Sequence, residues 1–166
     1  MAGYTAVSQV NLKETSHVKN LFDAETMNKL KIRLAHLRPQ SERQWGKMNS
    51  AQMLAHCSAW MEMAAGLNLP PRNWIGRVFG KAAKAGVLGN DPIRRNMPSE
   101  KSLIVSEQRE FVVEQQRLWE WMERFAASGP EGCTKHPHCF FGSMTPMEWS
   151  ILGYKHLDHH LRQFGV

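Results

Sequence analysis

The chain has 166 residues, 42% of them hydrophobic and 22% charged, which is typical of one soluble globular domain with a sizeable core. No apolar run approaches the roughly 18 residues needed to span a membrane. Three cysteines at irregular spacing, without an export signal, argue against a disulfide framework, so we expect a cytoplasmic protein with no membrane partner. The net charge of +6 keeps nucleic acid in view, but the basic residues are dispersed and form no recognition motif, so we do not expect nucleic-acid binding.

Residues 1–20 are predicted to form a loosely ordered arm, and the first helix is expected over about 24–37. Asp23 suits its N-cap, and Pro39 ends it. Its apolar side chains recur at spacings of three and four: Met27, Leu30, Leu34 and Leu37.

A second helix is expected over about 50–67, with Asn49 or Ser50 as its cap. Its stripe has the same spacing and consists of Met53, His56, Trp60, Met63 and Leu67. A shorter helix is expected from Trp74 to about residue 85, followed by a polar loop to about residue 102.

The third long helix is expected over about 106–127. Its candidate core positions are Phe111, Leu118, Trp121, Met122 and Phe125. A long loop, 127–144, leads to a last helix capped by Thr145 or Ser143, with Pro146 in the first turn, where proline is tolerated. The stripe of this helix is Trp149, Leu152, His156, His159 or His160, and Gln163.

No stretch is a convincing strand, so the predicted fold class is all-α. Four long helices, two of them separated by a long crossover with an extra short helix, predict a four-helix bundle. The bundle is expected to form a single domain over residues 1–166.

Three of the eight histidines fall within five residues of the last helix. His156 and His160 are four apart, which places their Cβ atoms about 5–6 Å apart on one helix face, where two imidazoles can converge on a cation. By spacing alone, His159 could equally be the partner of His156. His56 lies in the apolar stripe of the second helix, either as a hydrogen-bonded core residue or, if the two helices face each other, as the third nitrogen of a cluster.

Three separated motifs resemble a family of uncharacterised bacterial proteins in the DinB/YfiT-like metalloenzyme superfamily. They are WGKMNSAQMLAHC (45–57), HPHCFFG (136–142) and YKHLDHHLRQFG (154–165). The likeness covers the chain from about residue 20 to the end, and it implies a DinB-like four-helix bundle with a three-histidine metal site.

Matched residue by residue, the ligands implied by this resemblance are His56, His156 and His160. Leu161 stands where the superfamily often has arginine, a departure that leaves the metal pattern intact. The resemblance implies a divalent ion such as zinc, nickel or iron, and frequent homodimers. It also implies a small-molecule substrate, because some relatives transfer low-molecular-weight thiols such as bacillithiol or mycothiol and others hydrolyse or isomerise small compounds.

A general base is expected near such a site, and Glu148, two turns before His156, is the candidate. The alternative is that Glu148 caps its helix N-terminus, where an acid is favoured. Asp158 and Glu62 lie off the histidine faces, and Asp158 is expected to be a surface charge.

The loop 136–142 could cover the mouth of the bundle. His136 and His138 are therefore candidates for a substrate-facing or fourth-ligand role, against the simpler reading of a loop anchored by its two phenylalanines. The other candidate pocket or supporting residues are His159, Trp60, Trp149 and Gln163, and for the two tryptophans the simpler reading is core packing.

The leading hypothesis from the sequence is a metal-dependent enzyme of hydrolase or thiol-transferase type. The alternative is a non-catalytic helical bundle that binds a small molecule, in which the histidines are hydrogen-bonded core residues. A third hypothesis, a nucleic-acid-associated stress protein, depends only on the charge of +6.

Overall fold

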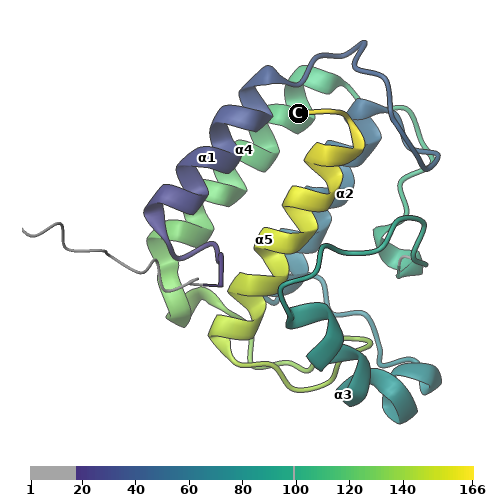
Figure 1. Ribbon diagram of the computed structural model, residues 1–166, viewed down its shortest axis with the longest axis vertical. Coiled ribbons are helices and arrows are strands. Elements are labelled where there is room, and N and C mark those ends of the chain that lie inside the picture. Colours follow the sequence, from purple (N-terminus) through teal and green to yellow (C-terminus); the bar gives the residue numbers. More distant parts are fainter. Residues whose placement is uncertain (1–17, 99) are drawn as a thin grey trace, which may run out of the picture.

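The computed structural model describes residues 18–98 and 100–166, and within them all regular structure is helical (Figure 1). The long helices are α1 (Ala24–His36), α2 (Ser50–Ala64), α3 (Trp74–Leu88), α4 (Phe111–Ser128) and α5 (Pro146–Gln163). Two short 3-10 helices, η1 (Lys101–Leu103) and η2 (Gly129–Gly132), lie in the connections. The described residues contain no strand, so the all-α prediction is confirmed, and the arm predicted over 1–20 falls almost wholly outside them.

Four of the helices enclose a common core. α1 and α2 each pack against both α4 and α5, and the contact between α2 and α4 is the most extensive. The largest fully buried side chains come from all four: Leu30, Leu34, Met53, Leu54, Leu118, Met122, Trp149 and Leu157. α3 packs on α5 alone among the long helices and lies at one edge of the molecule (Figure 1). None of the described helices is long and apolar enough to cross a membrane.

Side-chain caps begin three of these helices where the sequence predicted them. The Asp23 carboxylate accepts the Thr26 N–H at the start of α1. Asn49 and Thr145 begin α2 and α5 with capping boxes, in which the side chain of the third helical residue returns a bond to the cap N–H. Each cap satisfies backbone donors that the first turn leaves unpaired.

Three predicted boundaries are wrong, and the structure gives a physical reason for two of them. α2 ends at Ala64 instead of residue 67, because Gly66 adopts a left-handed φ of +82° that stops the helix and leaves Leu67 70% exposed. α4 begins at Phe111 instead of residue 106, because Gln52 of α2 holds the preceding loop by bonds to two of its carbonyls. α3 runs to Leu88, so the helix expected to be short is as long as α2.

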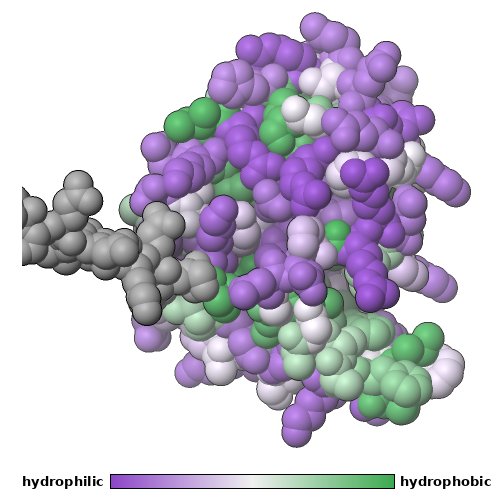
Figure 2. Space-filling view, in the orientation of Figure 1, coloured by the Kyte–Doolittle hydropathy of each residue, from purple (hydrophilic) through white to green (hydrophobic). Residues whose placement is uncertain are grey.

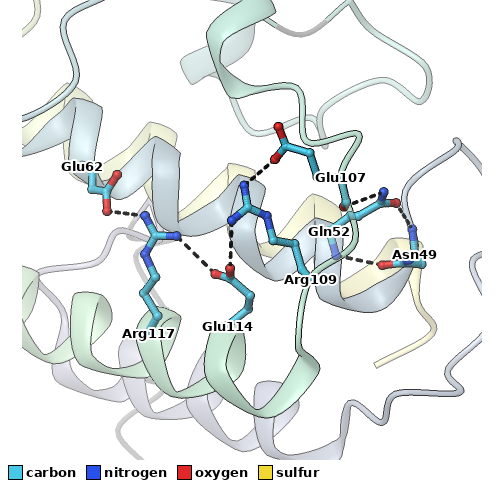
Figure 3. Close-up of polar contacts among 7 residues, drawn as sticks. All are labelled: Asn49, Gln52, Glu62, Glu107, Arg109, Glu114 and Arg117. Carbon is cyan, nitrogen blue, oxygen red and sulfur yellow. Dashed lines mark hydrogen bonds and ion pairs between the residues drawn. The ribbon is translucent and has the colours of Figure 1, made fainter.

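A buried carboxylate joins α4 to its surroundings (Figure 3). The Glu114 side chain is only 6% exposed and lies between two guanidinium groups, 3.2 Å from Arg117 and 3.7 Å from Arg109. Arg117 also contacts Glu62 of α2 at 2.6 Å, and Arg109 contacts Glu107 in the loop before α4 at 2.7 Å. The network therefore ties α2, α4 and this loop together.

We expect Glu114→Ala to lower the free energy of unfolding by about 1–3 kcal/mol, because it removes a buried partner of two arginines. The arginines are themselves partly exposed, which limits the loss. Urea unfolding measures the change. Glu110→Ala, at an exposed position just before the same helix, is the control and should change stability by less than about 0.5 kcal/mol. Equal losses in the two variants would contradict the assignment.

Candidate metal centre

His56 projects from the middle of α2, and its ring orientation is set by a backbone carbonyl. Its Nδ1 lies 2.7 Å from the Leu103 carbonyl oxygen, which can only accept, so Nδ1 carries the proton and donates. The lone pair of Nε2 is thereby directed away from this carbonyl, toward α5. A metal-binding histidine usually donates its other ring N–H to an acceptor such as a backbone carbonyl.

The Leu103 carbonyl is held in place from two sides. The Leu103 side chain is buried in the core at the end of η1. A few residues later, the Gln52 amide donates to the carbonyls of Ser106 and Glu107 at 3.1 and 3.2 Å (Figure 3 shows the contact with Glu107). Gln52 is one turn before His56 on α2, so the helix that carries the imidazole also fixes the loop that orients it.

His160 on α5 is oriented by a relay of two hydrogen bonds. Its Nδ1 lies 2.9 Å from Gln163 Oε1, and Gln163 Nε2 donates to the Trp45 carbonyl at 2.7 Å. Because that carbonyl needs a donor, the amide oxygen must face His160, and His160 must be protonated on Nδ1. Its Nε2 is thus also left with a lone pair.

Gly46 makes this relay possible. It has a φ of +81°, a conformation that favours glycine, and a Cβ there would overlap the Gln163 amide nitrogen. The glycine lets the chain approach Gln163 closely enough for the Trp45 carbonyl to accept its bond. Residues 45 and 46, at the beginning of the first motif, therefore act on the last helix.

His156 completes the cluster. Its Nε2 is 3.0 Å from His56 Nε2, and the three ring centroids are between 4.6 and 4.9 Å apart. One nitrogen from each ring lies within 4.8 Å of the others, so His56, His156 and His160 can hold a metal ion. His156 Nδ1 is buried and has no hydrogen-bond partner among the described residues.

Burial lowers the pKa of all three imidazoles. It brings that of His160, next to His56, to about 3. Burial, and then the neighbouring imidazoles, holds the pKa of His156 well below 6.5. For His56, burial outweighs the opposing hydrogen bond to Leu103, and the pKa is again lowered. The rings are therefore neutral at pH 7, which is the form that binds metals.

Tryptophans form one side of the cluster. Trp60 stacks on His156, with 5.3 Å between centroids and 23° between planes, and Trp149 packs on Trp60 at 5.9 Å. His138 lies against Trp149 in turn and is buried, with Nδ1 accepting the N–H groups of two following residues. His138 is not in the cluster of three nitrogens, and a role facing the substrate stays a prediction.

The remaining candidates are more distant from the three nitrogens or otherwise engaged. His136 is exposed, and its Nδ1 lies 3.0 Å from its neighbour's carbonyl. His159 points to the other flank, with Nδ1 3.3 Å from the Ile93 carbonyl and its ring against Trp45 and His160.

The acidic candidates have partners of their own. Glu148 accepts the Thr145 N–H with one oxygen and pairs with Lys84 at 2.7 Å with the other, contacts that match the helix-cap alternative. Its role as a base stays a prediction. Asp158 pairs with Arg33 at 2.7 Å.

A comparison with protein families identifies the family of this chain. The family described as "Protein of unknown function (DUF1569)" matches residues 19–165. The chain belongs to this family. No curated protein and no solved structure matches it. The DUF1569 match spans all three histidines of the cluster and both residues that orient them, Leu103 and Gln163.

We expect Gln163→Ala to weaken the binding of a divalent ion by roughly 10–100-fold, because His160 loses the acceptor that holds its tautomer and orientation. Competition with a chromophoric chelator measures the affinity. Gln116→Ala, on the exposed face of α4, is the matched control. Unchanged affinity in Gln163→Ala would show that the relay does not support binding.

Acid should destabilise the metal-free DUF1569 protein through these rings. Unfolded histidines bind protons below a pKa of about 6.5, whereas folded His160 stays neutral down to about 3, so stability falls as pH decreases through this window. Between pH 7 and 5.5, His160→Asn should lose about 1 kcal/mol less than the wild type. Urea unfolding with chelator present tests this, with His136→Asn, at an exposed ring, as control. Identical pH slopes in His160→Asn and the wild type would contradict it.

Proposed function

We propose that this DUF1569 protein is a metal-dependent enzyme of the DinB type, in which His56, His156 and His160 hold one divalent ion. The observation that carries the proposal is the orientation of two of the rings: the Leu103 carbonyl and the Gln163 amide oxygen each accept a hydrogen bond from Nδ1–H and leave an Nε2 lone pair for the cluster. The packing of α1, α2, α4 and α5 is compatible with the four-helix bundle of that superfamily.

The donor set also suits catalysis better than a purely structural role. Three protein ligands leave coordination positions open, whereas structural zinc sites are closed by four. With neutral ligands an ion keeps its full double charge, so it supplies a Lewis acid that polarises a substrate or lowers the pKa of a coordinated water or thiol. Zinc, nickel and iron all suit imidazole, and the chemistry of the ligands does not select among them.

The residues of the chain would provide the surroundings for this chemistry. Trp60 and Trp149 exclude water from one side of the cluster, beside His156. Glu148 stays the general base predicted from the sequence, and its two carboxylate oxygens contact the Thr145 N–H and Lys84. We propose a small-molecule substrate, with hydrolysis or transfer of a low-molecular-weight thiol as the reaction classes that follow from the DinB resemblance.

The alternative, a non-catalytic bundle with hydrogen-bonded core histidines, explains His56 and His160 but not the third ring. Because His56 Nε2 can only accept, His156 must either donate to it from Nε2 or oppose it with a second lone pair at 3.0 Å. If His156 donates, its buried Nδ1 becomes an acceptor with no donor among the described residues, and an unsatisfied buried polar atom costs about 1–3 kcal/mol. An ion bound by both Nε2 atoms would remove the opposition of the lone pairs.

Metal content tests the proposal. Protein purified without a histidine tag should contain about one divalent ion per chain, and His56→Ala/His160→Ala should contain none, because two of three ligands are lost. Inductively coupled plasma mass spectrometry measures both. The control is His36→Ala/His136→Ala, which removes two exposed histidines outside the cluster. Equal metal content in all three proteins would rule out the centre.

Chelation gives a second readout. A ligand present at about 100 times its dissociation constant stabilises the fold by about 2.7 kcal/mol, so the melting temperature should fall when the ion is removed. If chelator left the melting temperature unchanged, the hydrogen-bonded core would be the better explanation.

A further inference from the structure

Two glycines form the side of α3 that packs against the rest of the protein. Gly76 and Gly80, one turn apart, lie directly on the backbone of Phe140, and a Cβ at either position would come within 3.0 Å of the Phe140 carbonyl oxygen. These are the two residues of the helix that are fully buried. The contact leaves no room for apolar side chains on this side.

Four apolar side chains in the first half of α3 point outward instead. Trp74 is 72% exposed, Val78 65% and Phe79 58%, and Ile75 is exposed as well. Positions i, i+1, i+4 and i+5 lie on one helix face, so these four form a continuous apolar face, which we call the outer face of α3. An apolar area is visible where α3 protrudes at the edge of the molecule (Figure 2, compare Figure 1).

The outer face lies in a segment without acidic residues. Between Glu62 and Asp91 the sequence has no Asp or Glu, whereas it has four basic residues, namely Arg72, Arg77, Lys81 and Lys84. Arg77 and Lys81 are exposed along one edge of the outer face, and no carboxylate in the described parts of the chain pairs with either. The surface therefore combines exposed aromatic and aliphatic groups with positive charge.

We propose that the outer face of α3 binds an anionic lipid surface. A helix lying in the interface of a membrane has Trp, Phe and aliphatic residues on one face and Lys or Arg beside them, as here. At 15 residues α3 is about 23 Å long, so it can lie on a bilayer but not cross it. The proposal concerns the surface of a membrane, whereas none of the described helices is long and apolar enough to cross one.

A second copy of the chain fits the same face less well. A two-fold interface uses the same patch on both partners. If two α3 helices met antiparallel through their outer faces, the axis would bring the two edges that carry Arg77 and Lys81 together. Like charges so placed repel, and both chains carry a net charge of +6.

Sedimentation with lipid vesicles tests the proposal on the full-length protein. We expect binding to vesicles that contain phosphatidylglycerol, little binding to pure phosphatidylcholine, and release at about 0.5 M salt, because surface charge is then screened. Trp74→Ser/Phe79→Ser should weaken binding by at least about tenfold through the loss of buried apolar area. Arg77→Gln/Lys81→Gln should weaken it by about 30-fold on anionic vesicles.

Two controls match these variants. Val112→Ser/Val113→Ser changes an equally exposed apolar pair on α4, and Lys47→Gln/Lys135→Gln removes two exposed charges elsewhere. Both should bind like the wild type. Circular dichroism melting shows that each variant folds.

Three results would overturn the proposal. The first is no binding of the wild type to anionic vesicles at low salt, and the second is equal weakening by the α4 control. The third is a wild-type dimer in light scattering that Trp74→Ser/Phe79→Ser converts to a monomer, with no vesicle binding by either protein. That result would assign the outer face to a second copy.

Discussion

The candidate centre depends on two hydrogen bonds, each of which fixes the proton of one imidazole on Nδ1. An imidazole inside a protein has two nitrogens, and only the one without a proton can bind a metal. The Leu103 carbonyl accepts a hydrogen bond from Nδ1–H of His56, and the Gln163 amide oxygen accepts one from Nδ1–H of His160. With both Nδ1 protons committed, the two Nε2 lone pairs face the space between α2 and α5, next to His156.

These two bonds constrain parts of the chain far from the histidines. The loop before α4 is held by hydrogen bonds from Gln52 and by the Arg109–Glu107 pair, and α4 therefore begins only at Phe111. The 3-10 helix η1, just before this loop, presents the Leu103 carbonyl. The turn before α2 must have glycine at position 46, because a side chain there would overlap Gln163. Local structure that looks irregular on its own is therefore explained by the need to orient His56 and His160.

The helices and their caps could be predicted from the sequence because their causes are local. Asp23, Asn49 and Thr145 cap residues three positions away, and apolar periodicity follows from one helix at a time. The three histidines were also predictable from helix faces and from the family resemblance. The role of Leu103 was not predictable, because its side chain says nothing about what its carbonyl binds. The close approach of Gly46 to Gln163, far along the chain, could not be predicted from the local sequence either. For α3, the sequence predicts a helix but does not say that glycines would turn four of its apolar side chains outward.

The His156 ring distinguishes a metal centre from a hydrogen-bonded core. Neutral His156 has a single N–H, and its Nε2 lies 3.0 Å from a His56 nitrogen that can only accept. If His156 donates from Nε2, its Nδ1 becomes a buried acceptor without a donor; if it is protonated on Nδ1, that donor is unpaired and two lone pairs oppose each other at 3.0 Å. Hydrogen bonds among the described residues leave one polar group unsatisfied in either case. A cation between the rings accepts all three lone pairs, and this removes the repulsion that the second protonation state creates.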